Sequence, residues 1–237
     1  GTASGKTLCY NLPILDRLLQ EDDACALYLF PTKALAQDQL SKLHSTLESI
    51  QGKNSVNQIL AAIYDVDTPP GSRASIRSRV RLLLSNPDML HTGILPHHAS
   101  WMRFWRGLRY VVIDEMHTYR GVFGSHVANV IRRMKRVARF YGSSPQFILS
   151  TATIGNPTEL AERLVEEPVQ LIDEDGSAKG VKHFLIFNPP LIDQALGLRR
   201  SVLQETVNLA EDLLSHHVQT VIFGRSRRSV EILLTYL

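Results

Sequence analysis

The sequence predicts an α/β fold in which a parallel sheet is covered by helices on both faces. Short apolar runs, rich in aliphatic and aromatic residues and each closed by a polar residue or a proline, occupy residues 24–30, 110–113 and 147–149. Such continuous runs are typical of strands that are buried on both faces. Longer helical patterns lie between and after them, at residues 8–19, 34–50, 127–141 and 157–165. Alternation of strands and helices indicates a parallel sheet.

A second unit is expected after residue 190. An acidic turn at 173–176 and the breaker Asn188-Pro189-Pro190 predict a linker over residues 171–190. A helix over 199–216, a strand over 220–223 and a helix over 226–236 are predicted to follow. We therefore predict a first domain over 1–170 and the beginning of a second domain over 191–237, because some fifty residues are too few for a complete α/β domain.

Composition limits the class of protein. With 44% hydrophobic and 21% charged residues among 237, the chain has a globular composition, which excludes a disordered or fibrous protein. A net charge of +3 permits a nucleic-acid partner but does not argue for one. The two cysteines match no metal site and no disulfide framework, and neither a signal peptide nor an apolar run of about 18 residues is present. We expect an intracellular protein without a membrane partner, located in the cytoplasm or, if the source is eukaryotic, in the nucleus.

The first seven residues, Gly-Thr-Ala-Ser-Gly-Lys-Thr, match the end of a phosphate-binding loop. In such a loop a glycine lets backbone N–H groups close around phosphate oxygens, a lysine neutralises their charge, and a hydroxyl binds Mg²⁺. A glycine-rich surface turn is the alternative. The predicted nucleotide-binding residues are Thr2, Ala3, Ser4, Gly5, Lys6 and Thr7, and Lys6 is also a predicted catalytic residue.

Two adjacent acids, Asp114 and Glu115, follow the predicted strand 110–113. Ligand sites of open parallel sheets lie at the carboxyl ends of the strands. A carboxylate there can hold the metal of a nucleotide, and a second can orient or deprotonate water. We predict that Asp114 and Thr7 bind Mg²⁺ and that Glu115 activates water, so that Asp114 and Glu115 are catalytic residues together with Lys6. The alternative is a solvated turn at the strand end.

Three segments resemble motifs I, II and III of DEAD/DEAH-type helicases of superfamily two: residues 1–7, Asp-Glu-Met-His at 114–117, and Ser-Thr-Ala-Thr at 150–153. Residues 31–39 resemble motif Ia, residues 64–69 and 85–91 resemble strand-contacting segments, and residues 223–227 resemble motif IV. Residues 114–126 and 188–190 are similar to the YprA-like branch, whose members are DNA helicases linked to DNA repair. This resemblance implies a RecA-like P-loop NTPase domain followed by the start of a second RecA-like domain.

The resemblance also implies function. It implies an ATP-dependent helicase that uses ATP and Mg²⁺ to move along single-stranded DNA, or a duplex with a single-stranded tail, and to unwind duplexes. An RNA helicase and a nucleic-acid-dependent ATPase switch that does not unwind are the alternatives. The residues implied to couple the nucleotide site to movement are His117, Ser150, Thr151 and Thr153. The residues implied to bind nucleic acid are Thr32, Lys33, Gln37, Arg73, Asn86 and Asp88.

The sequence departs from that family's pattern in several places. Gly1 stands where the family commonly has proline, the segment before the phosphate loop is absent, motifs V and VI would lie beyond Leu237, and the branch's four-cysteine zinc module has no counterpart. We expect that the chain alone does not complete the catalytic cycle.

Several further residues have ordinary structural interpretations. We expect Trp101, Phe104 and Trp105, spaced as one helix face, to pack in the core. We expect Cys9 and Cys25 to be buried. The paired histidines at 97–98 and 216–217 lack metal-ligand spacing. Of two basic clusters, we expect the helical one at 132–139 to be a solvated face, and part of the one at 73–81 to face a nucleic-acid strand.

Overall fold

The computed structural model describes residues 5–51, 59–174 and 180–237. Two compact units, Gly1–Ala178 and Lys179–Leu237, are described separately below. Thr2, Ala3 and Ser4 of the predicted phosphate loop lie outside the described residues. In the described part of the chain, no helix is long and apolar enough to cross a membrane.

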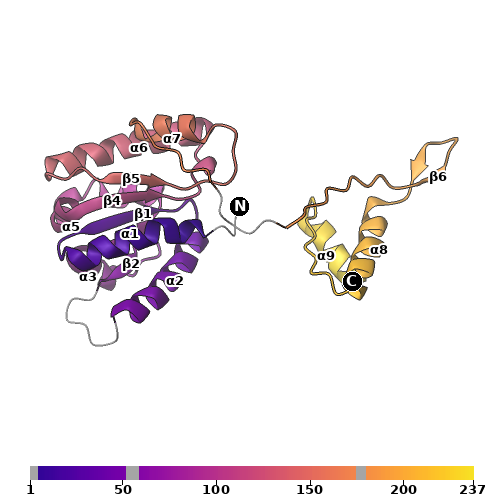
Figure 1. The fold of residues 1–237 in the computed structure, drawn as a ribbon, viewed down its shortest axis with the longest axis horizontal. Coiled ribbons are helices and arrows are strands. Elements are labelled where there is room, and N and C mark those ends of the chain that lie inside the picture. Colours follow the sequence, from indigo (N-terminus) through magenta and orange to yellow (C-terminus); the bar gives the residue numbers. More distant parts are fainter. Residues whose placement is uncertain (1–4, 52–58, 175–179) are drawn as a thin grey trace. The chain divides into compact units, whose positions relative to one another are not determined.

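A parallel sheet forms the centre of the first unit (Figure 1). Among the described residues its strands follow the spatial order β2-β3-β1-β4-β5, and every neighbouring pair is parallel. These strands are β1 (Cys25–Leu29), β2 (Ala61–Ile63), β3 (Leu82–Ser85), β4 (Leu108–Ile113) and β5 (Gln146–Leu149). The predicted α/β class with a parallel sheet is confirmed.

Helices cover both faces of this sheet. Alternate residues of β1 point to opposite faces, so Leu27 and Leu29 join one core and Ala26 and Tyr28 join the other. The helices α1 (Lys6–Gln20) and α2 (Lys33–Gln51) pack on the Tyr28 face. The opposite face is covered by α5 (Met102–Gly107), α6 (Gly121–Phe140) and α7 (Pro157–Val165).

The strands predicted over 24–30, 110–113 and 147–149 correspond to β1, β4 and β5. Strands β2 and β3 were not predicted from the sequence. β2 has only three residues, and the three leucines of β3 favour a helix as much as a strand until the neighbouring β1 pairs with them. The remaining elements of this unit are α3 (Pro70–Arg79), α4 (Pro87–Met89), η1 (Leu90–Ile94), η2 (His98–Trp101) and η3 (Met116–Thr118).

The second unit contains a hairpin and two helices. Strands β6 (Leu191–Asp193) and β7 (Leu198–Arg199) are antiparallel, and the turn between them is closed by Asp193, whose Oδ1 accepts hydrogen bonds from the amides of Ala195 and Leu196. Helices α8 (Val202–Ser215) and α9 (Arg227–Tyr236) match the two predicted helices. The strand predicted over 220–223 is wrong: that segment has no strand partner among the described residues, and Phe223 is 93% exposed.

Burial tests the structural interpretations. Trp101, Phe104 and Trp105 are fully buried and stack edge to face, so their predicted core role is confirmed. Cys25 is buried as predicted, and burial raises the pKa of its thiol to about 11. The prediction for Cys9 is wrong, because that residue lies on the outer side of α1 and is exposed.

The two basic clusters also differ from one another. Arg132, Arg133 and Arg136 are exposed, which confirms the solvated face of α6, although Lys135 is partly covered and pairs with Glu167. In the other cluster Arg81 is buried, and its guanidinium donates to the backbone oxygens of Leu18, Glu21 and Ala24. Arg81 therefore holds the α1–β1 connection and does not face a nucleic-acid strand.

Candidate nucleotide and nucleic-acid site

The carboxyl edge of the sheet gathers most of the predicted site residues. All strands of the sheet run in the same direction, so the residues that follow them emerge at one edge. Asp114 follows β4, Ser150 follows β5, Asn86 follows β3, and Thr32 comes shortly after β1. Segments that are far apart in the sequence are thereby brought to a common surface.

The phosphate loop enters α1 through Gly5. Its φ of +72° lies in the left-handed region, which costs a glycine little, and its carbonyl oxygen accepts the Leu8 amide at 2.9 Å. Lys6 begins the helix, so the positive end of the helix dipole adds to its charge. The Lys6 ammonium donates to the carbonyl oxygen of Thr151 at 2.5 Å. Motif I and motif III residues are therefore in direct contact.

Asp114 is held in one orientation by donors on both carboxylate oxygens. Its Oδ1 accepts the Glu115 amide at 3.0 Å, and its Oδ2 accepts the Tyr10 hydroxyl at 3.3 Å. Thr7, one helical turn earlier, also interacts with the Tyr10 side chain. Burial, and after it the charge of Asp114, raise the pKa of Tyr10 by more than Thr7 lowers it, so its hydroxyl keeps its proton. One phenol thus links the two predicted metal ligands, Thr7 and Asp114.

Sequence reasoning missed Tyr10. Tyr10 and Asp114 are 104 positions apart, and the signal for the contact would have been the three-residue spacing from Thr7 on a helix.

The donor set at this point suits Mg²⁺. A hydroxyl and a carboxylate are oxygen ligands of the kind that Mg²⁺ prefers, and Mg²⁺ is commonly held by one or two carboxylates together with substrate phosphates. Among the described residues no three acidic, histidine or cysteine side chains cluster as a self-sufficient metal site. Thr7 and Asp114 therefore fit a metal that arrives with a nucleotide.

Glu115 and His117 connect the acidic pair to the segment after β5. Glu115 has a positive φ of 50° at the start of η3, and its Oε2 lies 3.2 Å from His117 Nδ1. The same nitrogen lies 3.3 Å from the Ala152 amide. A protonated Nδ1 donates to Glu115, whereas an unprotonated Nδ1 accepts from Ala152. In a given protonation state, Nδ1 of His117 can therefore form a hydrogen bond with either the Glu115 carboxylate or the Ala152 amide of the motif III segment, but not with both.

Of the predicted coupling residues, the structure brings three together. The backbone of Ser150 bonds to Ile113 and Met116 on either side of the acidic pair, at 2.9 Å each. Thr151 supplies its carbonyl oxygen to Lys6, while its hydroxyl oxygen is buried and has no hydrogen-bond partner among the described residues. Thr153 is exposed. The contacts thus link Lys6, Ser150, Thr151 and His117, and leave Thr153 on the surface.

The predicted motif Ia residues lie at the start of α2. The Thr32 hydroxyl accepts the Leu35 amide at 3.3 Å, so it helps to cap the helix. The Lys33 ammonium lies 2.5 Å from Oδ2 of Asp67, and this hydrogen bond raises the pKa of Lys33. Gln37 is exposed one turn later. Asp67 is a neighbour that sequence reasoning did not assign.

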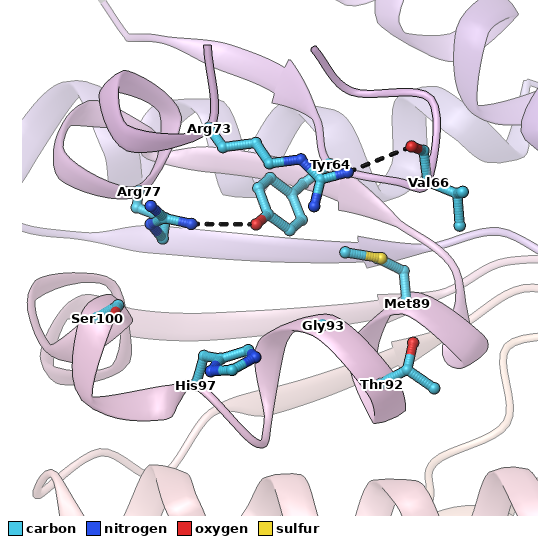
Figure 2. A pocket seen from close by; sticks show the side chains of 9 residues that line it. All are labelled: Tyr64, Val66, Arg73, Arg77, Met89, Thr92, Gly93, His97 and Ser100. Atoms are coloured by element: carbon cyan, nitrogen blue, oxygen red, sulfur yellow. Dashed lines mark hydrogen bonds between the residues drawn. The ribbon is translucent and has the colours of Figure 1, made fainter. Parts of the chain in front are cut away.

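Arg73 organises the turn that follows β2 (Figure 2). Its Nε donates to the Thr68 carbonyl oxygen at 3.0 Å, and its Nη2 donates to those of Val66 at 3.2 Å and Asp65 at 3.3 Å. The guanidinium carbon also lies 5.3 Å from the centre of the Tyr64 ring. The structure therefore gives Arg73 a structural task, the shaping of the predicted strand-contacting segment.

The segment after β3 is shaped by Asn86. Its Oδ1 accepts the Met89 amide at 2.8 Å and caps the short helix α4. Asp88, in the first turn, is exposed. The six predicted nucleic-acid residues thus come from three neighbouring loops and helix starts at one sheet edge, and Arg73 and Asn86 shape the loops that present them.

The chain is similar in sequence to known proteins. The profile of the DEAD/DEAH box helicase family matches residues 1–160. The chain is 52% identical to the ATP-dependent helicase YprA of Bacillus subtilis over 236 residues, which is 100% of this chain and 31% of YprA. It is 42% identical to the ATP-dependent helicase HRQ1 of Saccharomyces cerevisiae over 98% of this chain and 22% of HRQ1.

Solved structures are similar as well. A crystal structure of the DUF1998 helicase MrfA bound to DNA matches 99% of this chain and 31% of the MrfA chain, with a TM-score of 0.95 and 52% identity. A structure of the Mycobacterium smegmatis helicase Lhr bound to single-stranded DNA and AMP-PNP matches 98% of this chain and 30% of the Lhr chain, with a TM-score of 0.70 and 25% identity. The fold of the first unit is therefore RecA-like, and the chain spans about a third or less of the length of these relatives.

Proposed function

The chain belongs to the DEAD/DEAH box helicase family, whose members use ATP, and on that premise we propose that it is part of the motor core of an ATP-dependent DNA helicase. In this proposal the hydrolysis of Mg-ATP moves the protein along a single strand and separates a duplex. The observation that carries it is the direct contact between the phosphate-loop Lys6 and Thr151, beside the paired acids Asp114 and Glu115.

The first step is nucleotide capture. We propose that Lys6 leaves the Thr151 carbonyl oxygen for the β- and γ-phosphates, because a phosphate group offers the ammonium a stronger partner than a neutral carbonyl. Backbone amides at the start of α1, with Gly5, complete the cradle. Thr7 and Asp114 would hold Mg²⁺, which when bound neutralises charge on the phosphates. Thr2, Ala3 and Ser4 are proposed to belong to the same loop.

Glu115 is proposed to orient and deprotonate the attacking water. Its carboxylate is about one-third exposed and lies 3.2 Å from Nδ1 of His117. A carboxylate in this place can take the proton from water as the γ-phosphate is transferred. When the Lys6 ammonium leaves Thr151, the carbonyl of the motif III segment loses its partner, so we propose that Ser150, Thr151, Thr153 and His117 transmit the nucleotide state.

The strand is proposed to lie over Thr32, Lys33, Gln37, Arg73, Asn86 and Asp88. These residues come from loops and helix starts at the sheet edge. The preference for DNA is supported by the likeness to MrfA, whose structures are described as bound to DNA. We also propose that residues 171–190 are an interdomain linker and that residues 191–237 begin a second RecA-like domain.

Nucleotide binding and strand displacement test the proposal in the full-length protein. Lys6→Ala is expected to abolish detectable binding of a fluorescent ATP analogue, while Lys42→Ala, on the exposed side of α2, keeps it. The unchanged protein is expected to displace a strand from a tailed DNA duplex only with ATP. ATP hydrolysis without strand displacement would instead support an ATPase switch that does not unwind.

A further inference from the structure

A second concave site lies beside the predicted strand path (Figure 2). It is a cavity of about 520 Å³ between Tyr64, which follows β2, helix α3, and the α4–η2 segment. The volume is within the range of small-ligand sites. Among the described residues, neither Gly5, Lys6 and Thr7 nor the acidic pair line this cavity, so it is distinct from the described part of the proposed ATP site.

One end of the cavity is rich in hydrogen-bond donors. Arg77 from α3 lines it opposite His97 and Ser100 (Figure 2). Arg77 Nη1 donates to the Tyr64 hydroxyl oxygen at 3.3 Å, and the other N–H groups of its guanidinium have no hydrogen-bond partner among the described residues. In the part of the chain that the structure describes, no acidic side chain lines the cavity and no ion pair neutralises Arg77. This end therefore favours an anion with several acceptor oxygens.

The other end is of mixed character. Met89 and Val66 line it with the ring of Tyr64, together with Thr92 and the Arg73 guanidinium, which lies 5.3 Å from the centre of that ring (Figure 2). Gly93 leaves room for Met89, since a Cβ at Gly93 would lie 2.1 Å from the Met89 methyl carbon. A flat, weakly polar group fits against a tyrosine ring and a thioether. The cavity thus combines an anion-binding end with a surface for a sugar or a base.

We propose that this cavity holds one nucleotide unit of the bound strand, with its phosphodiester at Arg77 and its sugar or base against Tyr64 and Met89. The inference rests on the proposed function, because it assigns a contact of the same nucleic-acid surface. The cavity opens between the two predicted strand-contacting segments, which supply Tyr64 and Met89. Phosphate contacts position a strand without reading its sequence, so the cavity serves any base.

A pair of matched arginine variants tests this contact. Arg77 and Arg79 lie on the same helix, and only Arg77 lines the cavity, while Arg79 is exposed. Binding of a labelled single-stranded DNA to the full-length protein would be followed by fluorescence anisotropy across a salt series. Arg77→Gln is expected to weaken binding about tenfold for every sequence and to lower the salt slope by about 0.7. Arg79→Gln is expected to change binding less than twofold.

A second variant separates the contact from folding. Ser100→Glu places a negative charge at the donor-rich end and leaves the Arg77 and Tyr64 side chains unchanged, and Ser100 is exposed enough to accept it. It is expected to weaken DNA binding at least as much as Arg77→Gln while the melting temperature stays unchanged. If Arg77→Gln does not fold, DNA binding by Ser100→Glu alone tests whether the strand contacts the cavity.

The outcomes separate the cavity from the proposed function. Equal losses in Arg77→Gln and Arg79→Gln, or full binding by Ser100→Glu, would overturn the cavity contact while the motor proposal stands. Failure of the unchanged protein to bind DNA or RNA at all would overturn the proposed function, and the cavity contact with it. A cavity that binds free AMP but does not affect strand binding would also contradict the inference.

Discussion

The hydroxyl of Tyr10 lies 3.3 Å from Oδ2 of Asp114, although the two residues are 104 positions apart. The ring of Tyr10 is buried and packs edge to face on Tyr28 at 5.5 Å. The opposite oxygen of Asp114 accepts the Glu115 amide. The carboxylate is thus already oriented in this structure, which would lower the cost of forming the metal site that we propose.

We expect Tyr10→Phe to weaken Mg²⁺ binding in the presence of ADP by about tenfold, because the carboxylate of Asp114 loses one of its two orienting donors. Isothermal titration calorimetry with Mg²⁺ measures this directly and needs no catalysis.

Tyr28→Phe is the matched control for Tyr10→Phe. It also removes one buried hydroxyl from the same cluster, but that hydroxyl bonds to Asn11 and not to Asp114. Equal Mg²⁺ affinities in the two variants would contradict a positioning role for Tyr10.

The ion pair between Lys33 and Asp67 predicts a gain of function. Asp67→Asn removes a negative charge 2.5 Å from the ammonium that we propose to bind a phosphate. Exposed pairs of this kind contribute little because water screens them, so single-stranded DNA should bind only about two- to fivefold more tightly. Anisotropy titrations at low salt measure the change, and high salt should diminish it.

Asp38→Asn controls for the overall change in charge. Asp38 forms a comparable exposed pair with Lys42 on α2, outside the predicted strand contacts, and its substitution should leave DNA binding unchanged. Weaker binding by Asp67→Asn would show that the pair helps to position Lys33 for the strand instead of competing with it.

Arg81 is expected to matter for stability and not for DNA binding. Its guanidinium satisfies three backbone oxygens at the α1–β1 connection, and the residue is 7% exposed. Arg81→Ala should lower the free energy of unfolding by about 3 kcal/mol, since those oxygens would lose their donor. Urea denaturation measures this, with the exposed Arg79→Ala expected to change stability by at most about 0.5 kcal/mol. An Arg81→Ala protein that is as stable as the unchanged protein but binds DNA poorly would show that Arg81 contacts the strand and is not a structural residue.

The sequence was informative where residues that act together are also neighbours along the chain. Lys6 and Thr7 are adjacent, as are Asp114 and Glu115, and each pair stands where a buried run or a helix begins or ends. The parallel α/β class followed from β1, β4 and β5, whose apolar runs are unambiguous. These features depend on local pattern alone, which is why they could be predicted.

Contacts between distant segments could not be predicted. Nothing in the sequence distinguishes the buried Arg81 from its neighbours Arg77 and Arg79, because burial is decided by where α1 and β1 meet. Likewise, Cys9 and Cys25 both stand among apolar residues, yet the one on α1 faces outward. The predicted strand at 220–223 had the right composition but no neighbouring strand among the described residues.

Steady-state ATP hydrolysis by the full-length protein, with and without single-stranded DNA or RNA, tests the central claim most directly. We predict strong stimulation by DNA, weaker stimulation by RNA, and a loss of at least about 100-fold in Glu115→Gln, because the water would lose its base. Equal stimulation by RNA would contradict the assignment to DNA. A rate of ATP hydrolysis that neither DNA nor RNA increases would contradict the proposed motor. An unchanged rate in Glu115→Gln would contradict it as well.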